Sequence, residues 1–307
     1  MPLPYWFDPP SNPELEAAIF AEPDELGPYL VYGDWLQSIG DLRGELIAVH
    51  FAQQQTPDSI DLRAREVALC EELGSSWSWL LREKARIELE WRLGFVDGIR
   101  LRSLREPRFE VDATWLRDVL TLPATRMLRS LALTADIDGQ GSHGNIRNLE
   151  EILTLLPTVE RLQLYGQNLQ IAWIELPKLR YLQMDAPQEN WTLLTLATPL
   201  LETLIVHDGY DLAQLRAILD GEITSLRNLG LPQTSLDDEL YEELIASPTL
   251  ARLESLEVRC FELSGEGWSR LRTQAAFSHL RQLRIRQHDN LSEAERNLVF
   301  GLCPDVK

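Results

Sequence analysis

Cysteine, histidine and basic residues are all scarce in this chain of 307 residues, and each scarcity excludes a class of protein. The three cysteines, Cys70, Cys260 and Cys303, share no short spacing, so neither a disulfide framework nor a zinc site is expected. The five histidines include no pair at a metal-binding spacing, and no phosphate-binding glycine loop or Gly-x-Ser-x-Gly elbow occurs. We therefore expect neither a cofactor nor an enzymatic activity.

Charge and hydropathy exclude further classes. Asp and Glu number 48 against 29 Lys and Arg, and a surface with a net charge of -19 repels nucleic-acid phosphates and anionic membranes. No apolar run reaches the roughly 18 residues of a membrane-spanning helix, and the first residues lack the features of a secretory signal. Free thiols suit a reducing compartment. The sequence thus predicts a cytoplasmic protein that binds neither nucleic acid nor membrane.

An internal repeat is the strongest positive signal in the chain. Apolar residues recur in triplets, with two variable residues before the central member and one after it. The central members are separated by 32, 31, 20, 22, 25, 27 and 27 residues. Because side chains alternate along a strand, each triplet predicts a strand whose apolar residues are buried. The triplets are Val96-Ile99-Leu101, Leu128-Leu131-Leu133, Val159-Leu162-Leu164, Leu179-Leu182-Met184, Leu201-Leu204-Val206, Leu226-Leu229-Leu231, Leu253-Leu256-Val258 and Leu280-Leu283-Ile285.

Between the triplets, apolar residues at spacings of three and four predict helices over residues 115–120, 149–156, 212–219 and 240–245. This alternation resembles the leucine-rich-repeat family over about residues 95–288. The resemblance implies an α/β fold, a leucine-rich-repeat solenoid with a curved parallel sheet and helices on its convex side. The asparagine that the family usually places three residues after each triplet is missing, which leaves the regularity of the curvature open.

Residues 1–86 lack the triplet and carry helical patterns instead. Asn12 before Pro13 predicts a helix start, and further helices are expected over 29–39, 44–55, 62–73 and 77–86. Ile87, Leu89 and Trp91 alternate with charged residues and predict a strand or hairpin that caps the first repeat.

The helical region carries a second resemblance. Tyr32-Gly33-Asp34-Trp35-Leu36, followed by Gly40-Asp41 and Arg43-Gly44-Glu45, resembles the repeat-companion domain of bacteria, a short helical module found beside leucine-rich and other repeats. Gly33 replaces the alanine usual in that family. The module implies no catalysis. We expect its aromatic residues to be buried and Asp34 to pair with Arg43, the alternative being a docking site.

These patterns together predict three parts of the chain. Residues 1–86 form a helical repeat-companion domain, and 87–290 form the solenoid with its N-terminal cap strand. Residues 291–307 form a C-terminal capping helix, which a capping box of Ser292 and Glu295 is expected to start at Glu293.

The side chains that flank each triplet centre are expected on the concave side of the sheet, and such a surface favours binding of a protein partner. An acidic segment of the partner is expected at the arginines, unless these pair with Glu257. Two alternatives are a hydrolase or ligand-binding enzyme with its site at the domain junction, and self-association. The partner-binding candidates are Tyr165 and Tyr181, expected to be neighbours, with Ile205, His207, Glu257, Arg259, Arg284 and Arg286.

Overall fold

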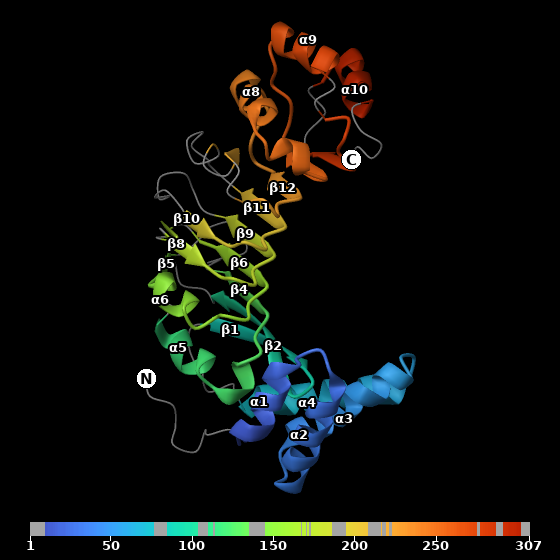
Figure 1. Cartoon of the computed structure of the whole chain (residues 1–307), viewed down its shortest axis with the longest axis vertical. Coiled ribbons are helices and arrows are strands. Elements are labelled where there is room, and N and C mark those ends of the chain that lie inside the picture. Colours follow the sequence, from blue (N-terminus) through green and yellow to red (C-terminus); the bar gives the residue numbers. More distant parts are fainter. Residues whose placement is uncertain are drawn as a thin grey trace.

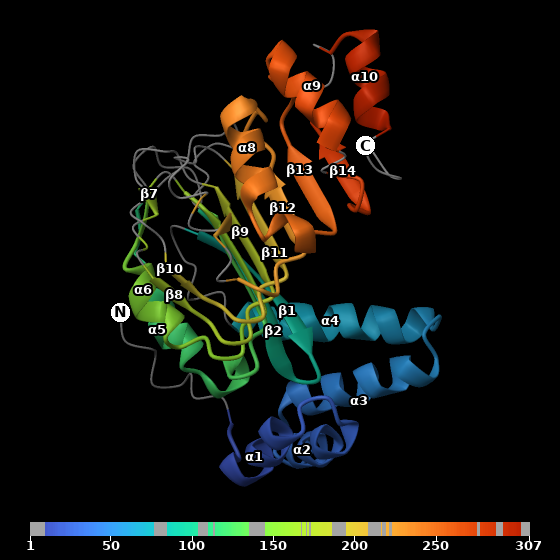
Figure 2. The ribbon, with the colours of Figure 1, turned by 45° about the horizontal axis from the view of Figure 1, so that its top comes forward.

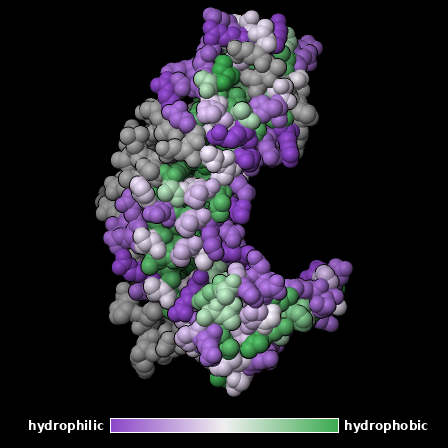
Figure 3. Space-filling view, viewed as in Figure 1, coloured by the Kyte–Doolittle hydropathy of each residue, from purple (hydrophilic) through white to green (hydrophobic). Residues whose placement is uncertain are grey.

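The computed structural model shows an elongated molecule bent into an arch (Figure 3), with N-terminal helices at one end and C-terminal helices at the other (Figures 1 and 2). An arm of two helices, α3 (Leu42–Gln55) and α4 (Ile60–Ser76), projects beside the hollow (Figure 1). The structure describes residues 10–76, 85–103, 110–112, 114–134, 145–166, 168–169, 171, 173–185, 195–207, 216, 219–220, 223–274, 277–286 and 291–301.

A nine-stranded sheet runs along the arch, and only its first two strands pair antiparallel. The strands follow one another in chain order, and the central residues of the eight triplets are register partners from Ile99 to Leu283. The predicted parallel strands are therefore confirmed. They are β2 (Phe95–Ser103), β4 (Ser130–Thr134), β6 (Arg161–Tyr165), β9 (Tyr181–Asp185), β11 (Thr203–His207), β12 (Asn228–Leu231), β13 (Ser255–Val258) and β14 (Gln282–Ile285), and β1 (Ala85–Arg92) is the antiparallel strand at the end of the sheet.

One continuous apolar core lies behind this sheet. In β6, β9 and β11 every second residue is buried, and the residues between them remain partly exposed, as alternation along a strand requires. The buried members are the triplet residues, and they pack against apolar residues of the returning segments. Burial of the triplets therefore decides which face of the sheet meets solvent.

The returning segments form the outer side of the arch, where Figure 1 shows helices and short strands. The two shortest repeats, of 20 and 22 residues, cross this side as strands β8 (Trp173–Glu175) and β10 (Thr195–Ala197), which the sequence analysis did not predict. The other outer elements are α5 (Thr114–Leu120), α6 (Leu149–Leu153), α8 (Asp238–Ala246), the unpredicted α9 (Gly265–Gln274), η2 (Pro123–Thr125), η4 (Leu250–Arg252) and the sheet of β3 (Glu110–Asp112), β5 (Asn145–Arg147) and β7 (Asn168–Leu169).

Four predicted N-terminal helices are confirmed: α1 (Pro13–Ala21), α2 (Leu26–Ser38), α3 and α4. The Asn12 side chain caps α1 by accepting a hydrogen bond from the Leu15 N–H at 3.2 Å. Most of the fifth predicted helix and of the helix at 212–219 lies outside the described residues. Residues 85 and 86 belong to β1, so the prediction that the fifth helix extends to residue 86 was wrong. The predicted domain boundaries stay predictions.

The β1–β2 hairpin joins the helices to the sheet. Its two-residue turn, Leu93-Gly94, has positive φ at both positions, 48° and 78°, which the twist of a tight hairpin favours. Leu93 and Phe95 are buried in one cluster with Tyr29 and Tyr32 of α2. The turn thus forms part of the core of the helical region.

A buried carboxylate adds a second connection. Glu16 is fully buried and accepts hydrogen bonds from the Tyr32 hydroxyl at 3.1 Å and from Ser11 Oγ at 2.8 Å. Its other oxygen contacts Arg126 Nη1 at 2.6 Å, 110 residues away in sequence.

None of the described helices is long and apolar enough to cross a membrane.

The C-terminal cap is confirmed: α10 (Glu293–Phe300) begins directly after Ser292, and both hydrogen bonds of the capping box are present. Val299 is buried against the last repeat, whereas Leu302 lies outside the described residues. We expect Ser292→Ala to lower the free energy of unfolding by about 0.5–2 kcal/mol, because it removes the acceptor for the Glu295 N–H.

Chemical denaturation measures this loss, with the exposed Ser269→Ala as the control. Hydrogen bonds from Ser292 lower the pKa of Glu295, so their contribution is present above the ordinary glutamate pKa and is lost as the pH falls through the lowered one. An equal loss in the two variants would contradict the role of the cap.

Candidate functional site

The nine-stranded sheet lines the hollow side of the arch (Figure 1), and we call its solvent-facing surface the inner face. At its centre, the inner face carries Gln163 and Tyr165 of β6, Tyr181 and Gln183 of β9, and Ile205 and His207 of β11. These side chains are half-buried. They occupy the positions that alternation assigned to solvent, so the predicted placement of Tyr165, Tyr181, Ile205 and His207 on one face is confirmed.

A chain of hydrogen bonds connects three strands of the inner face. Gln163 Nε2 donates to Gln183 Oε1 at 2.9 Å, and Gln183 Nε2 lies 3.0 Å from His207 Nε2. The Tyr181 hydroxyl donates to Gln183 Oε1 at 2.6 Å, and Gln163 Nε2 lies 3.5 Å from the Tyr165 hydroxyl oxygen. We call these five residues the amide chain. Sequence reasoning placed both glutamines on this face but had no signal to single them out.

The expected side-by-side position of Tyr165 and Tyr181 was wrong. In the register, Tyr181 lies opposite Arg161, and Tyr165 lies opposite Asp185. The Arg161 guanidinium stacks over the Tyr181 ring, 3.7 Å from its centroid. The two tyrosines are therefore connected through the glutamines, because equal positions in two triplets lie opposite each other and these tyrosines hold different positions.

The tyrosine and glutamine side chains at the centre of the inner face are uncharged at neutral pH. Burial raises the pKa of Tyr165 and that of Tyr181, so both hydroxyls stay protonated over the physiological range. Ile205 leans over Gly230, where an added Cβ would lie 3.2 Å from its Cγ atoms. Charged residues flank this centre at Arg161 and Asp185. It therefore offers neutral donors and acceptors beside an aliphatic surface.

The arginine cluster near the C-terminal end of the sheet is not a set of free cations. Arg286 Nε contacts Glu257 Oε1 at 2.5 Å, and Arg284 Nη1 lies 3.8 Å from Glu257 Oε2. Glu257 is only 7% exposed, so the prediction that it is an exposed residue available to a partner was wrong. Local pairing, the alternative weighed from the sequence, holds for these two arginines. Arg259 is half-buried just beyond β13.

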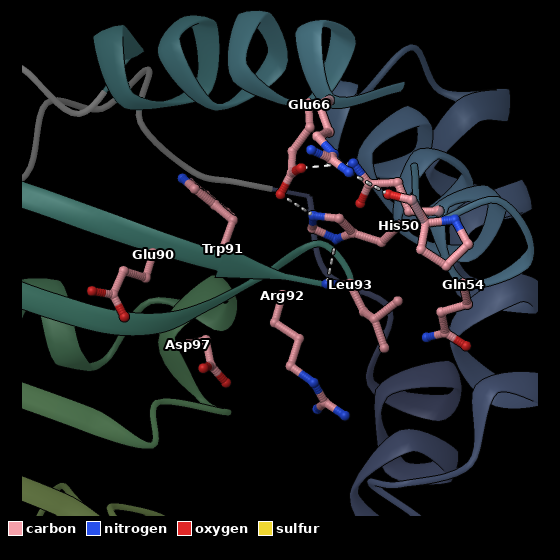
Figure 4. A pocket seen from close by; sticks show the side chains of 11 residues that line it. His50, Gln54, Glu66, Glu90, Trp91, Arg92, Leu93 and Asp97 are labelled. Atoms are coloured by element: carbon pink, nitrogen blue, oxygen red, sulfur yellow. Dashed lines mark hydrogen bonds and ion pairs between the residues drawn. The ribbon is translucent and has the colours of Figure 1, made fainter. Parts of the chain in front are cut away.

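A cavity of about 750 Å³ lies where the helical arm meets the hairpin. Figure 4 shows His50 between Glu66 and Leu93, with Trp91 and Glu90 on the hairpin side. We call this the corner pocket. Its remaining lining residues are Gln53, Gln54, Pro57, Arg63, Arg92 and Asp97. The pocket contains none of the predicted site residues, because its walls come from segments that share no sequence motif.

Hydrogen bonds hold His50 in one neutral form. The Leu93 N–H donates to Nδ1 at 3.0 Å, so the proton is on Nε2, which lies 3.1 Å from Glu66 Oε1. The same carboxylate accepts from Gln53 Nε2 at 2.7 Å. Both ring nitrogens of His50 are therefore occupied, and its role here is to tie the hairpin turn to α3 and α4.

Other sequence expectations concern single residues. Arg43 is buried and pairs with Asp41, its Nη2 lying 2.8 Å from Oδ2, so the expected Asp34–Arg43 pair was wrong. Arg43 pairs with Asp41 rather than Asp34 because Asp41 also caps α3, where its side chain accepts a hydrogen bond from the Arg43 N–H. Cys260 is buried, as expected for a packed thiol. Among the described residues, no three His, Cys, Asp or Glu side chains are grouped as a metal would require.

Comparisons with known proteins identify a similar fold and no family. No family model and no curated protein matches the chain. A structural-genomics crystal structure of a protein from Bacteroides fragilis is similar to 64% of the chain with a TM-score of 0.50, at 17% identity. The match spans 61% of that protein's length. At this identity the likeness concerns the fold alone, which is a mixed α/β architecture with N-terminal helices and a large, mostly parallel sheet.

Proposed function

We propose that this chain is a leucine-rich-repeat solenoid that binds a partner protein on its inner face. The observation that carries the proposal is the amide chain with its surrounding residues: aromatic, amide and arginine side chains on rigid, paired strands facing the hollow. Tyrosine and arginine are enriched among residues that dominate binding energy, and preorganised side chains lose little entropy on binding. Catalysis forms no part of this proposal, and a cytoplasmic location stays a prediction.

The proposed partner contact is neutral at its centre. Burying a charge of the partner against Gln163, Gln183 and Ile205 would leave that charge without a counter-charge, which is costly. An acidic segment fits better at the arginine end, where Arg284 and Arg286 are half exposed and share the single carboxylate of Glu257. The proposed partner thus has a neutral, partly apolar segment that contacts the centre of the inner face and an acidic segment that contacts the arginine end.

A pull-down from native lysate followed by calorimetry with the purified partner tests this proposal. We expect Tyr165→Ala combined with Ile205→Asp to weaken binding at least 100-fold, the loss typical of a contact centre. Trp173→Ala on the outer side, where the side chain is 51% exposed, is the matched control and keeps full affinity. A partner that the inner-face variant still binds, or that the Trp173 variant loses, refutes the proposed surface.

A second test probes the acidic segment. Charge reversal at Arg284 and Arg286 would leave the buried Glu257 facing two carboxylates, so that double variant is expected to destabilise the fold. Arg284→Gln keeps the closer Arg286–Glu257 pair and removes one cation. Its expected effect is a several-fold loss of affinity that disappears at high salt, since an exposed charge contributes mainly through screened attraction.

Ligand binding in the corner pocket is a second candidate function. The cavity lies at the predicted domain junction, and its volume is in the range of small-molecule sites. His50 has no nitrogen left to act as a base, and none of the lining residues is a serine, threonine or cysteine. The pocket therefore favours binding over hydrolysis. A rise in melting temperature with a small molecule that Gln54→Trp abolishes would support it.

A further inference from the structure

The hydrogen bonds of the amide chain run in one direction when the glutamine amides are oriented as the structure places them. Gln183 Oε1 accepts from Tyr181 and Gln163, so its Nε2 group is the donor toward His207. With the amides in this orientation, His207 Nε2 is the acceptor and the imidazole carries its proton on Nδ1. In this arrangement the Tyr181 hydroxyl donates its hydrogen to Gln183 Oε1. The Tyr165 hydroxyl accepts from Gln163 Nε2, so its own hydrogen is not used within the amide chain.

The same atomic positions also fit the opposite direction. If both glutamine amides turn by half a rotation, Gln183 Nε2 donates to the Tyr181 oxygen and to Gln163 Oε1. Tyr165 then donates to Gln163 Oε1, and Gln183 Oε1 accepts from His207 Nε2–H. Every contact of the chain is kept and every donor becomes an acceptor. The two directions differ in which groups remain available to solvent and in whether His207 Nε2 carries a proton.

We propose that protonation of His207 reverses the amide chain and thereby exchanges the hydrogen-bonding roles that Tyr165 and Tyr181 present on the inner face. A protonated imidazole has N–H donors at both nitrogens, so Gln183 can face it only with Oε1. Before protonation, Tyr181 offers outward only acceptor lone pairs and Tyr165 offers a donor. After protonation the two exchange roles.

The proposal rests on the proposed function in one respect, because the exchanged roles matter to a partner bound at this face. A partner that donates a hydrogen bond to Tyr181 fits the neutral form, whereas a partner that accepts one fits the protonated form. The face would therefore choose between partners, or release one, over the range of about pH 5 to 8 in which histidine changes charge.

Charged groups around His207 are few. Asp185 lies opposite it on β9, and Tyr165 lies opposite Asp185 on β6. On the other side, the pairing of β11 with β12 ends at Ile205 opposite Gly230, and Glu257 lies opposite Gly230 on β13. Glu257 and Arg161 both act electrostatically on Tyr181. Asp208, next in the chain, lies outside the described residues.

Nuclear magnetic resonance of the free protein tests the proposal without a partner. Tyrosines labelled with ¹³C at Cζ report the role of each hydroxyl, and ¹⁵N-labelled imidazoles report the protonation of His207, over about pH 8 to 5. We expect the Tyr165 and Tyr181 signals, assigned through Tyr→Phe variants, to shift with the same midpoint as His207. His207→Gln, which keeps a neutral side chain with an acceptor, should abolish both shifts.

Two further variants separate transmission from a general pH effect. Gln183→Leu should leave His207 titrating while both tyrosine signals stay constant. Gln163→Leu should abolish the pH-dependent shift of the Tyr165 signal and leave that of Tyr181 unchanged. Circular dichroism confirms that each variant is folded, and Gln183→Met replaces a leucine variant that unfolds. Constant tyrosine signals while His207 titrates in the wild type overturn the proposal, as does a His207 that stays neutral to pH 5 or a tyrosine response that persists in Gln183→Leu.

This outcome is separate from that of the proposed function. A reversal of the amide chain in a protein whose partner binds elsewhere refutes only the proposed surface. Binding at the inner face with pH-independent tyrosine signals refutes only the reversal.

Discussion

Replacing Gly44 by alanine is expected to destabilise the protein by about 3 kcal/mol or more, because the crossing of α2 and α3 leaves no space for a side chain. A Cβ at position 44 would lie 2.6 Å from the carbonyl oxygen of Gly33 and 2.7 Å from the backbone nitrogen of Gln37. Both atoms belong to the backbone of α2. The clash is relieved only if the two helices separate and lose the packing between them.

Gly33→Ala is the matched control at the same crossing. A Cβ there meets Cγ2 of Ile47 at 3.2 Å, a side-chain atom that can move by a few tenths of an ångström. Alanine also favours the helical backbone by up to about 1 kcal/mol over glycine. We expect a change below about 1 kcal/mol. Equal denaturation midpoints for the two variants would contradict the close crossing.

Replacing Gly94 by alanine is expected to cost about 2–4 kcal/mol, because two penalties add. Its φ of 78° lies in the left-handed region, which costs an alanine about 1–2 kcal/mol. A Cβ would also lie 2.9 Å from Cδ1 and Cγ1 of Ile47, the residue on which the hairpin turn packs. The loss should appear in chemical denaturation as a lower midpoint with an unchanged slope.

Gly40→Ala isolates the conformational part of this loss. Gly40 also has a φ of 78°, but no atom lies within 4 Å of the position that a Cβ would take. We expect only the left-handed penalty of about 1–2 kcal/mol. The excess for Gly94 should shrink when Ile47→Val is added, because the crowding atoms are then fewer. Identical losses at the two glycines would show that the turn is not packed against α3.

The inner face illustrates how far sequence reasoning reached. Alternation along each strand placed Tyr165, Tyr181, Ile205 and His207 on the solvent side, since a buried triplet leaves only one face for the residues between. The same rule said nothing about which of them touch. Tyr165 and Tyr181 are connected through two glutamines because of how far each side chain reaches across the sheet, and the sequence pattern contains no such distance.

The sequence by itself determined the local and periodic features of this protein: eight parallel strands in register, four N-terminal helices and the capping box at Ser292. Each follows from a pattern of residues close in the chain, either the alternation of apolar residues or the pairing of a capping side chain with its helix. Only the tertiary structure decided the corner pocket, the pairing of Glu257 with two arginines and the contact of Glu16 with Arg126. A polar side chain takes whichever partner the packing brings within hydrogen-bonding distance, and that distance is set by apolar burial elsewhere in the fold.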